Sequence, residues 1–289
     1  MAPMNKDSTP SPLRKKLGLE LRRLRQGAKI SAEEAATRLE LSASTISRGE
    51  TGIVTIHPRD VDAMLRLYGV TDGRKREALL ALARKSRERG WWHHYRNILS
   101  NDMVNFISVE YGASTMSGYQ TLVLPGLLQT PDYTRAIAAL LPRPSKPEVV
   151  EQLVKIRIQR QEMLLEREDP LPLNVVLDQS LLYRPIGSHK VMREQLEHLV
   201  KMAERDNIYL QVLHYEAGEH PGLGGPFTLF GFAEPMDLAV VYVENHVNFL
   251  LVEDETDIRH YELVFQGVQK SALPAADSLA LVNDIAERL

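Results

Sequence analysis

The chain has 289 residues, a formal net charge of −3 and no cysteine. The lack of cysteine excludes disulfide scaffolding, thiolate catalysis and cysteine-ligated zinc, and the length suffices for two domains that each bury a core. The sequence holds neither an apolar run of membrane-spanning length nor a hydrophobic signal core. We therefore expect a cytoplasmic protein.

Charge is distributed unevenly along the chain. Residues 1–90 hold 19 Lys and Arg against 11 Asp and Glu, a net charge of +8, whereas the remaining residues hold 16 against 27, a net charge of −11. A basic N-terminal part followed by an acidic remainder predicts a nucleic-acid partner for the first part only. We expect a disordered tail at 1–12, a helical domain at 13–90 and a second domain at 91–289.

Leucines recur at helical spacing from the start of the predicted helical domain. Leu13, Leu17, Leu21 and Leu24 predict an amphipathic helix that ends at Gly27. Its other faces are predicted to form a basic exterior of Arg14, Lys15, Lys16, Arg22, Arg23 and Arg25.

Capping residues place the next two helices. Ser31 is predicted to begin a second helix in a capping box with Glu34, and Ser42 to begin a third, which Gly52 ends in a left-handed conformation. Apolar residues over 61–68 and 79–83 predict a fourth and a fifth helix. Five short helices with a tight turn between the second and third predict a helix-turn-helix unit.

The third helix has one clear core residue, Ile46, and its other side chains are small, polar or basic. Such a face suits close approach to a nucleic acid followed by hydrogen bonding. The predicted DNA contacts are Ser42, Ala43, Ser44, Thr45, Ser47 and Arg48 on this helix, and Arg22, Arg23 and Lys29 on phosphates.

The run from Leu13 to Val70 resembles the Xre-type helix-turn-helix family. It matches the family pattern Ser-x-x-Thr-Ile-Ser-Arg-apolar-Glu-x-Gly at Ser42, Thr45, Ile46, Ser47, Arg48, Glu50 and Gly52. Gly49 departs from the pattern where an apolar residue is usual, and Ala32 departs where a glutamine commonly contacts phosphate. We therefore expect one phosphate contact fewer and a weakened third helix, because glycine inside a helix costs about 1 kcal/mol relative to alanine.

The remainder of the chain mixes helices and strands. We predict helices over 103–111, 149–166, 192–203, 255–270 and 275–288, a helix begun by Thr130, and strands over 173–178, 208–214, 227–232, 238–244 and 248–252. No regular alternation of strand and helix is recognised, which favours an α+β domain with a mainly antiparallel sheet.

Five segments of this second domain resemble, in the same order, a domain of unknown function carried by many actinobacterial Xre-type regulators. The segments are PGLLQTPDY, VVLDQSLLYRPIG, REQLEHL, GPFTLF and VVYVEN. Members of that group are described as antitoxin-like, and the resemblance implies binding of a small companion protein encoded nearby.

Other candidate sites in the second domain rest on weaker patterns. Ligand or partner contacts are predicted at Trp91, Trp92, Leu127, Gln129 and Tyr133, although aromatic residues beside a domain junction more often pack than form a ligand cage.

Two polar groupings are candidates for chemical sites. His214, Glu216, Glu219 and His220 match no known metal-ligand spacing, and Asp178 and Glu244 end strands, where a carboxylate commonly serves as a cap. We predict no metal, no cofactor and no enzymatic activity.

The sequence as a whole predicts a DNA-binding transcriptional regulator that acts as a homodimer on a palindromic operator. Its second domain is expected to bind the companion protein; the alternative is a sensor of a small molecule. In either case the protein is expected in the cytoplasm, at the nucleoid when bound to double-stranded DNA, and not at a membrane.

Overall fold

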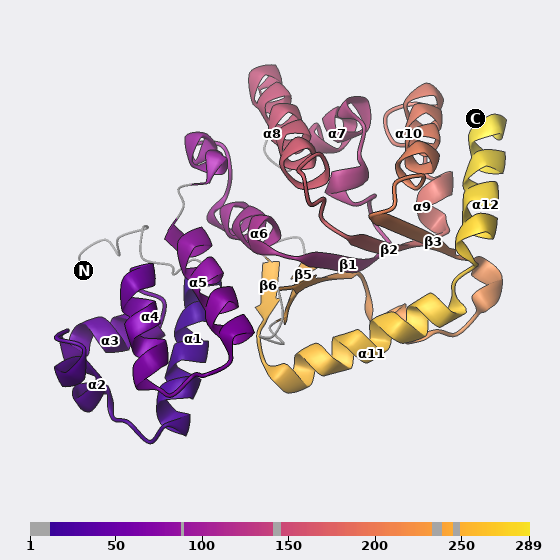
Figure 1. The fold of residues 1–289 in the computed structure, drawn as a ribbon. Helices are drawn as coiled ribbons and strands as arrows, with labels where there is room; N and C mark the ends of the chain where they lie inside the picture. The colour runs from indigo at the N-terminus through magenta and orange to yellow at the C-terminus, as the bar shows by residue number, and fades with distance from the viewer. Residues whose placement is uncertain (1–11, 88–89, 141–145, 233–238, 245–248) are drawn as a thin grey trace, which may run out of the picture. The chain divides into compact units, whose positions relative to one another are not determined.

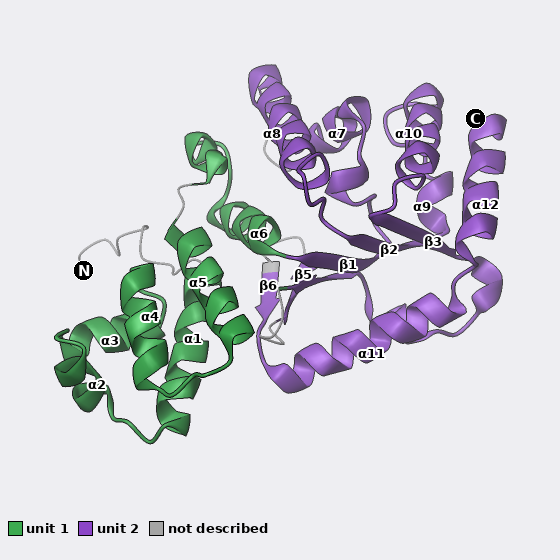
Figure 2. Ribbon diagram, in the orientation of Figure 1, with its two compact units in different colours: residues 1–113, 232–238 green, residues 114–231, 239–289 purple. Residues whose placement is uncertain are grey.

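The computed structural model describes residues 12–87, 90–140, 146–232, 239–244 and 249–289 (Figure 1). It divides into two compact units, unit 1 with residues 1–113 and 232–238 and unit 2 with residues 114–231 and 239–289 (Figure 2). The disordered tail predicted at 1–12 lies outside the described residues except for Pro12, which begins the first helix. Within the described part of the chain, no helix combines the length and the apolar character needed to cross a membrane.

The described part of unit 1 is built from helices. The five helices predicted from the sequence are confirmed, and a 3-10 helix and a sixth α-helix follow them. The elements are α1 (Pro12–Gly27), α2 (Ala32–Arg38), α3 (Ala43–Glu50), α4 (Pro58–Leu67), α5 (Gly73–Arg87), η1 (Trp91–Tyr95) and α6 (Asn101–Gly112). Because α6 packs against α1, unit 1 extends to residue 113 and not to the boundary predicted at residue 90.

The core of unit 1 is formed where the apolar stripes of its helices meet. The predicted leucines of α1 are buried or nearly so, and they pack with residues from each of the next four helices. The largest fully buried side chains of this core are Leu13, Leu21, Ile46, Met64, Leu65 and Leu79. The pattern of the sequence and the core agree because three- and four-residue spacing puts these side chains on one side of each helix.

Unit 2 contains a six-stranded sheet in the order β3-β2-β1-β4-β5-β6. Its strands are β1 (Thr115–Gln120), β2 (Leu173–Asp178), β3 (Ile208–Leu213), β4 (Phe227–Gly231), β5 (Ala239–Glu244) and β6 (Phe249–Val252). Its helices are η2 (Gly126–Leu128), α7 (Pro131–Ala138), α8 (Pro147–Leu165), α9 (Ser180–Tyr183), α10 (His189–Met202), η3 (Tyr215–Ala217), η4 (Pro221–Gly224), α11 (Glu255–Ser271) and α12 (Ala275–Arg288).

The α+β class is confirmed, and the sheet is mixed. β1 pairs with β2, and β2 with β3, in parallel, whereas the pairs β1–β4, β4–β5 and β5–β6 are antiparallel. The prediction of no regular strand–helix alternation is wrong for the first three strands, because α7 and α8 connect β1 to β2 and α9 and α10 connect β2 to β3. The alternation cannot be read from the sequence unless β1 is included, and its segment TMSGYQ is not predicted as a strand.

Helices cover both faces of the sheet in unit 2. Helix α11 lies along one face and α7, α8 and α10 along the other, as Figure 1 shows. On the α11 face, Ile258, Phe265 and Val268 are buried against residues of the sheet such as Tyr119 and Val241. Helix α12 packs against α10 and the edge strand β3.

Candidate nucleic-acid interface

Hydroxyl caps fix the start of both helices in the α2–α3 pair. Ser31 Oγ accepts the backbone N–H of Glu34 at 3.0 Å, and Ser42 Oγ accepts that of Thr45 at 3.0 Å. The predicted capping box is only half formed, because the Glu34 carboxylate pairs with Arg38 at 2.7 Å. The turn between the helices uses a positive φ of 54° at Glu40.

Helix α3 has one buried and one exposed side. Ile46, Gly49 and Glu50 are buried. The exposed residues are Ala43, Ser44, Ser47 and Arg48, while Thr45 is half-buried with its hydroxyl 2.7 Å from that of Ser42. The structure thus places four of the predicted DNA-contacting residues of α3 on one exposed helical face, and Thr45 is not among them.

Arg48 is the cation of this exposed face. No ion pair joins it to any of the described residues. Its guanidinium therefore keeps its hydrogen-bond donors for an outside partner, whereas the neighbouring exposed side chains of Ala43, Ser44 and Ser47 are small enough for close approach.

A close backbone contact holds α3 against α1. A Cβ atom built on Gly18 of α1 would lie 2.4 Å from the carbonyl oxygen of Glu50 and 2.5 Å from that of Gly49. A Cβ on Gly49 would lie 2.5 Å from the buried side chain of Ile56. Ile56, from the loop after α3, thus occupies the space in which the Xre-type pattern has an apolar side chain.

Gly52 ends the α3 segment as predicted. It adopts a φ of 73°, and its N–H donates to the carbonyl of Gly49 at 3.0 Å. A Cβ at this position would lie 2.7 Å from the backbone of Lys15. Left-handed backbone and close approach both demand glycine here.

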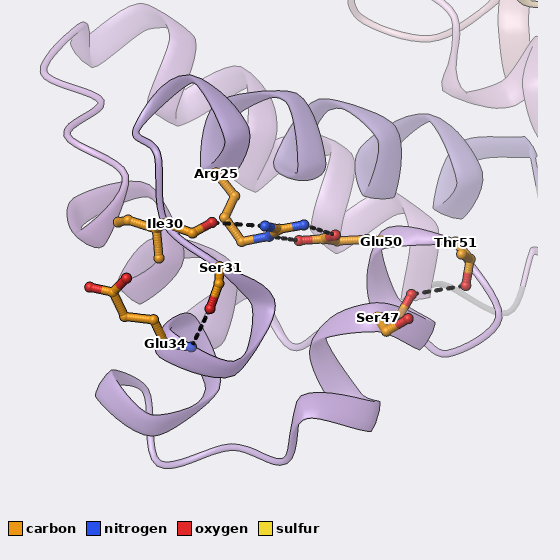
Figure 3. Close-up of polar contacts among 7 residues, drawn as sticks. All are labelled: Arg25, Ile30, Ser31, Glu34, Ser47, Glu50 and Thr51. Carbon is orange, nitrogen blue, oxygen red and sulfur yellow. Dashed lines mark hydrogen bonds and ion pairs between the residues drawn. The ribbon is translucent and has the colours of Figure 1, made fainter.

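A buried ion pair lies behind α3, between this helix and α1 (Figure 3). Arg25 Nε and Nη2 donate to the two carboxylate oxygens of Glu50 at 2.6 and 2.9 Å, and Arg25 Nη1 donates to the carbonyl of Ile30 at 2.8 Å. The hydrogen bond with Glu50 is the main reason that the pKa of Arg25 is raised. Placing Arg25 on a basic exterior was therefore wrong: the residue is 9% exposed.

Lys16 is a second residue wrongly assigned to that exterior, since it is 6% exposed. Glu20, also on α1, is buried and accepts from Arg23 at 2.9 Å and from Lys75 at 2.7 Å. Part of the positive charge of α1 is thus neutralised within unit 1.

The three predicted phosphate contacts differ in their surroundings. Arg22 is exposed and pairs with no described residue. Arg23 is exposed but bound in a fork to Glu20, so part of its charge is already compensated. Lys29 is exposed in the turn after α1, with a φ of 58°.

The five predicted ligand or partner residues do not fall within one unit. Trp91 and Trp92 belong to unit 1, where the Trp92 ring lies edge-on to Tyr111 with centroids 5.3 Å apart. Leu127, Gln129 and Tyr133 belong to unit 2 and are buried.

Glutamine side chains bind the backbone around Gln129. Gln129 Nε2 donates to the carbonyl of Leu124 at 2.7 Å, and its Oε1 accepts from Thr134. Gln161 donates to the carbonyl of Gln129 at 2.8 Å, and Gln195 to that of Leu128 at 2.7 Å. These contacts connect η2 to α8 and α10, so the segment from Leu124 to Thr134 contributes to the interior of unit 2.

The two histidines among the candidate metal ligands, His214 and His220, cap the 3-10 helices η3 and η4, and the strand-end carboxylate of Asp178 binds the backbone at the start of α9. His214 Nδ1 accepts the N–H of Glu216, and His220 Nδ1 that of Gly222, each at 3.2 Å. Asp178 Oδ1 accepts the N–H of Ser180 at 2.9 Å. Among the described residues, no three His, Asp or Glu side chains lie close enough together to hold a metal ion.

Comparison with known proteins gives two family matches. Residues 16–79 match a helix-turn-helix domain, and residues 103–284 match a domain of unknown function, DUF5753. Neither the curated proteins nor the solved structures gave a match. The first match runs from within α1 through α2, α3 and α4 into α5, and therefore includes the exposed face of α3.

Proposed function

The chain belongs to the DUF5753 family, and because a helix-turn-helix domain precedes the family domain, we propose that it is a sequence-specific transcriptional regulator of the Xre type. The observation that carries the proposal is the exposed face of α3, with its small side chains and an arginine that pairs with no described residue. Regulation is by binding, and no catalytic step is assigned to the chain.

Helix α3 enters the major groove in this proposal. Ala43, Ser44 and Ser47 approach the base edges closely, and Arg48 donates to a guanine or to a phosphate. Ser42 and Thr45 contribute less, because their hydroxyls bond to one another. Arg22 and Lys29 contact phosphates, which fixes the register of the protein on the duplex. Arg23 also contacts a phosphate, although the carboxylate of Glu20 compensates part of its charge.

Selection of duplexes from a random pool tests sequence-specific binding directly. The full chain should enrich one sequence and bind it at least about 1,000-fold more tightly than unrelated DNA, the lower range for specific regulators. An unenriched pool would reject the proposal.

The few side chains on α3 that can distinguish bases suggest a homodimer on a palindromic operator. Two half-sites would then lie about one helical turn or a multiple of it apart. The selected sequence should show two inverted repeats, and sedimentation of the full chain with this duplex should give two chains per duplex. One chain per duplex would count against the dimer.

Unit 2 is proposed to bind the small companion protein that the resemblance to the antitoxin-like group implies. Two exposed tyrosines support a protein partner, because Tyr183 and Tyr215 stack with centroids 6.4 Å apart, and exposed aromatic residues are enriched at protein interfaces. Co-expression of the full chain with the protein encoded beside it should yield a complex that the double variant Tyr183→Ser/Tyr215→Ser loses. A bound small molecule instead of a protein would favour the sensor.

A further inference from the structure

A cleft of about 780 Å³ in unit 1 is lined by basic side chains. Arg14 comes from α1, Arg87 from the end of α5, and His93, His94 and Arg96 from η1 and the residue that follows it. No Asp or Glu is found among the described residues that line the cleft. The described lining therefore brings three guanidinium groups and two imidazoles around a space open to solvent.

The arginines of the cleft repel one another. Arg14 is partly buried, and its Nε donates to the carbonyl of Ser86 at 3.3 Å, a neutral acceptor. Burial and the charge of Arg96 both lower the pKa of Arg14. Arg87 and Arg96 are exposed, and neither forms an ion pair with a described residue. Like charges gathered in this way are unfavourable unless an anion compensates them.

Two close-packed glycines help to shape the cleft. A Cβ on Gly90 would lie 2.2 Å from the ring of Trp92, so the absence of a side chain at residue 90 leaves the space that this ring occupies. Gly52 packs on the backbone of Lys15, which brings the α3–α4 loop to the start of α1, and Thr55 of this loop also lines the cleft. The basic groups thus come from segments that are packed together in unit 1.

We propose that this cleft binds a phosphate group. A phosphate offers several oxygen acceptors around one centre, which suits guanidinium groups that converge from different elements. The phosphate comes either from the backbone of bound DNA, next to the loop that follows α3, or from a free phosphorylated compound. Binding of a DNA phosphate rests on the proposed function, whereas binding of a free phosphorylated compound does not.

The test compares two double variants of the full chain. Arg87→Gln/Arg96→Gln removes two charges from the cleft, and the exposure of both residues favours retention of the fold, which circular dichroism checks. Arg74→Gln/Arg259→Gln removes two exposed charges elsewhere and is the matched control. Arg74 lies at the other end of α5, about 20 Å from Arg87 at 1.5 Å per residue.

Two measurements distinguish the sources of the phosphate. The first is the salt dependence of binding to a 30-base-pair duplex of random sequence, in which each phosphate contact contributes about 0.9 to the slope of log K against log salt. The second is calorimetric titration with inorganic phosphate and with pyrophosphate.

A slope that falls by about 1 or more in the cleft variant, but not in the control, assigns the site to DNA. An unchanged slope, with phosphate or pyrophosphate binding that only the cleft variant loses, assigns it to a free compound. If the cleft variant matches the control in both measurements, the inference is wrong. Wild-type protein that binds pyrophosphate in the cleft but no duplex would reject the proposed function and leave the inference standing.

Discussion

At the scale of single residues, a buried polar group lies behind the exposed face of α3. Tyr68, at the end of α4, is close enough to Glu50 and Arg25 for their charges to influence its pKa. Its hydroxyl is buried and makes no hydrogen bond with the described residues. Burial is the main reason that the pKa of Tyr68 is raised to about 12, because an ionised phenolate loses its hydration there.

Replacing Tyr68 by phenylalanine should therefore stabilise the protein. A buried hydroxyl without a partner costs roughly 1–3 kcal/mol, so we expect the free energy of unfolding to rise by about 1 kcal/mol in urea titrations at pH 7. A loss of more than 1 kcal/mol would show that the hydroxyl has a partner.

The same variant has a predicted pH dependence. The pKa of Tyr68 in the folded chain lies above the usual 10, so the unfolded chain ionises first as pH rises. The contribution of neutral Tyr68 to the free energy of unfolding is therefore fully present below pH 10 and is lost as pH rises towards 12. The advantage of Tyr68→Phe over wild type should thus grow between pH 10 and pH 12. Since the other tyrosines remain in both proteins, a constant difference would contradict the assignment to Tyr68.

The role of a single residue can be predicted from the sequence where that role depends on local spacing. The Ser31 and Ser42 caps and the left-handed Gly52 follow from residue type and position alone. Arg25 was misplaced because basic residues were assigned to the surface by type, although Arg25 lies four residues after the buried Leu21. Its partner, Glu50, lies 25 residues away in the sequence, and no local sequence pattern predicts a contact over that separation.

At the scale of elements, the geometry of α3 depends on how closely it meets α1. Gly18 allows the two backbones to touch, and Gly49 leaves room for Ile56. Gly49 has no side chain to pack inside α3, and the side chain of Ile56 from the following loop fills that space instead. The glycine is evident in the sequence, whereas the packing of Ile56 over it depends on the tertiary structure.

Gly18→Ala should displace α3. The new methyl group would meet backbone carbonyls, which cannot rotate away as a side chain can, and overpacking of this kind costs about 1–3 kcal/mol. We expect this loss in unfolding free energy, together with weaker binding to the selected duplex. Gly27→Ala, at the end of the same helix, is the matched control, because nothing lies within 4 Å of its Cβ. Equal effects of the two substitutions would contradict the close contact.

The sheet shows why element prediction fell short in unit 2. β1 has the sequence TMSGYQ, with few of the β-branched residues that mark strands, yet it pairs with both β2 and β4. Its position in the middle of the sheet is determined by backbone pairing with β2 and β4 and not by its own residue types. The alternating segment at β4 and the apolar run at β2 were predicted because burial on one or both faces leaves a pattern in the sequence itself.

At the scale of the whole molecule, the chain returns to unit 1 after most of unit 2 has been built. Phe232, directly after β4, packs against the core of unit 1. The two units therefore do not correspond to two consecutive stretches of sequence. Composition and charge predicted two parts, but only the packing shows that the first unit is completed by a residue so far along the chain.

Phe232→Ala should loosen unit 1. Truncating a fully buried phenylalanine to alanine lowers the free energy of unfolding by about 3–5 kcal/mol. Phe232 is only partly buried, so its truncation should cost less. Amide hydrogen exchange in peptides from α1 to α5 should become faster in this variant. Leu263→Ala, at an exposed position of α11, should leave this exchange unchanged. Unaltered exchange in the Phe232 variant would show that Phe232 adds nothing to unit 1.

If the exposed face of α3 distinguishes DNA sequences, Arg48→Ala should reduce that discrimination. In mobility-shift titrations at one salt concentration, affinity for the selected duplex should fall about 10- to 100-fold, the range for a lost arginine–guanine contact, with a much smaller loss on unrelated DNA. Arg22→Ala, a phosphate contact, should weaken both duplexes alike. An equal loss on both duplexes for Arg48→Ala, or no loss on either, would show that the exposed face of α3 does not read the DNA sequence.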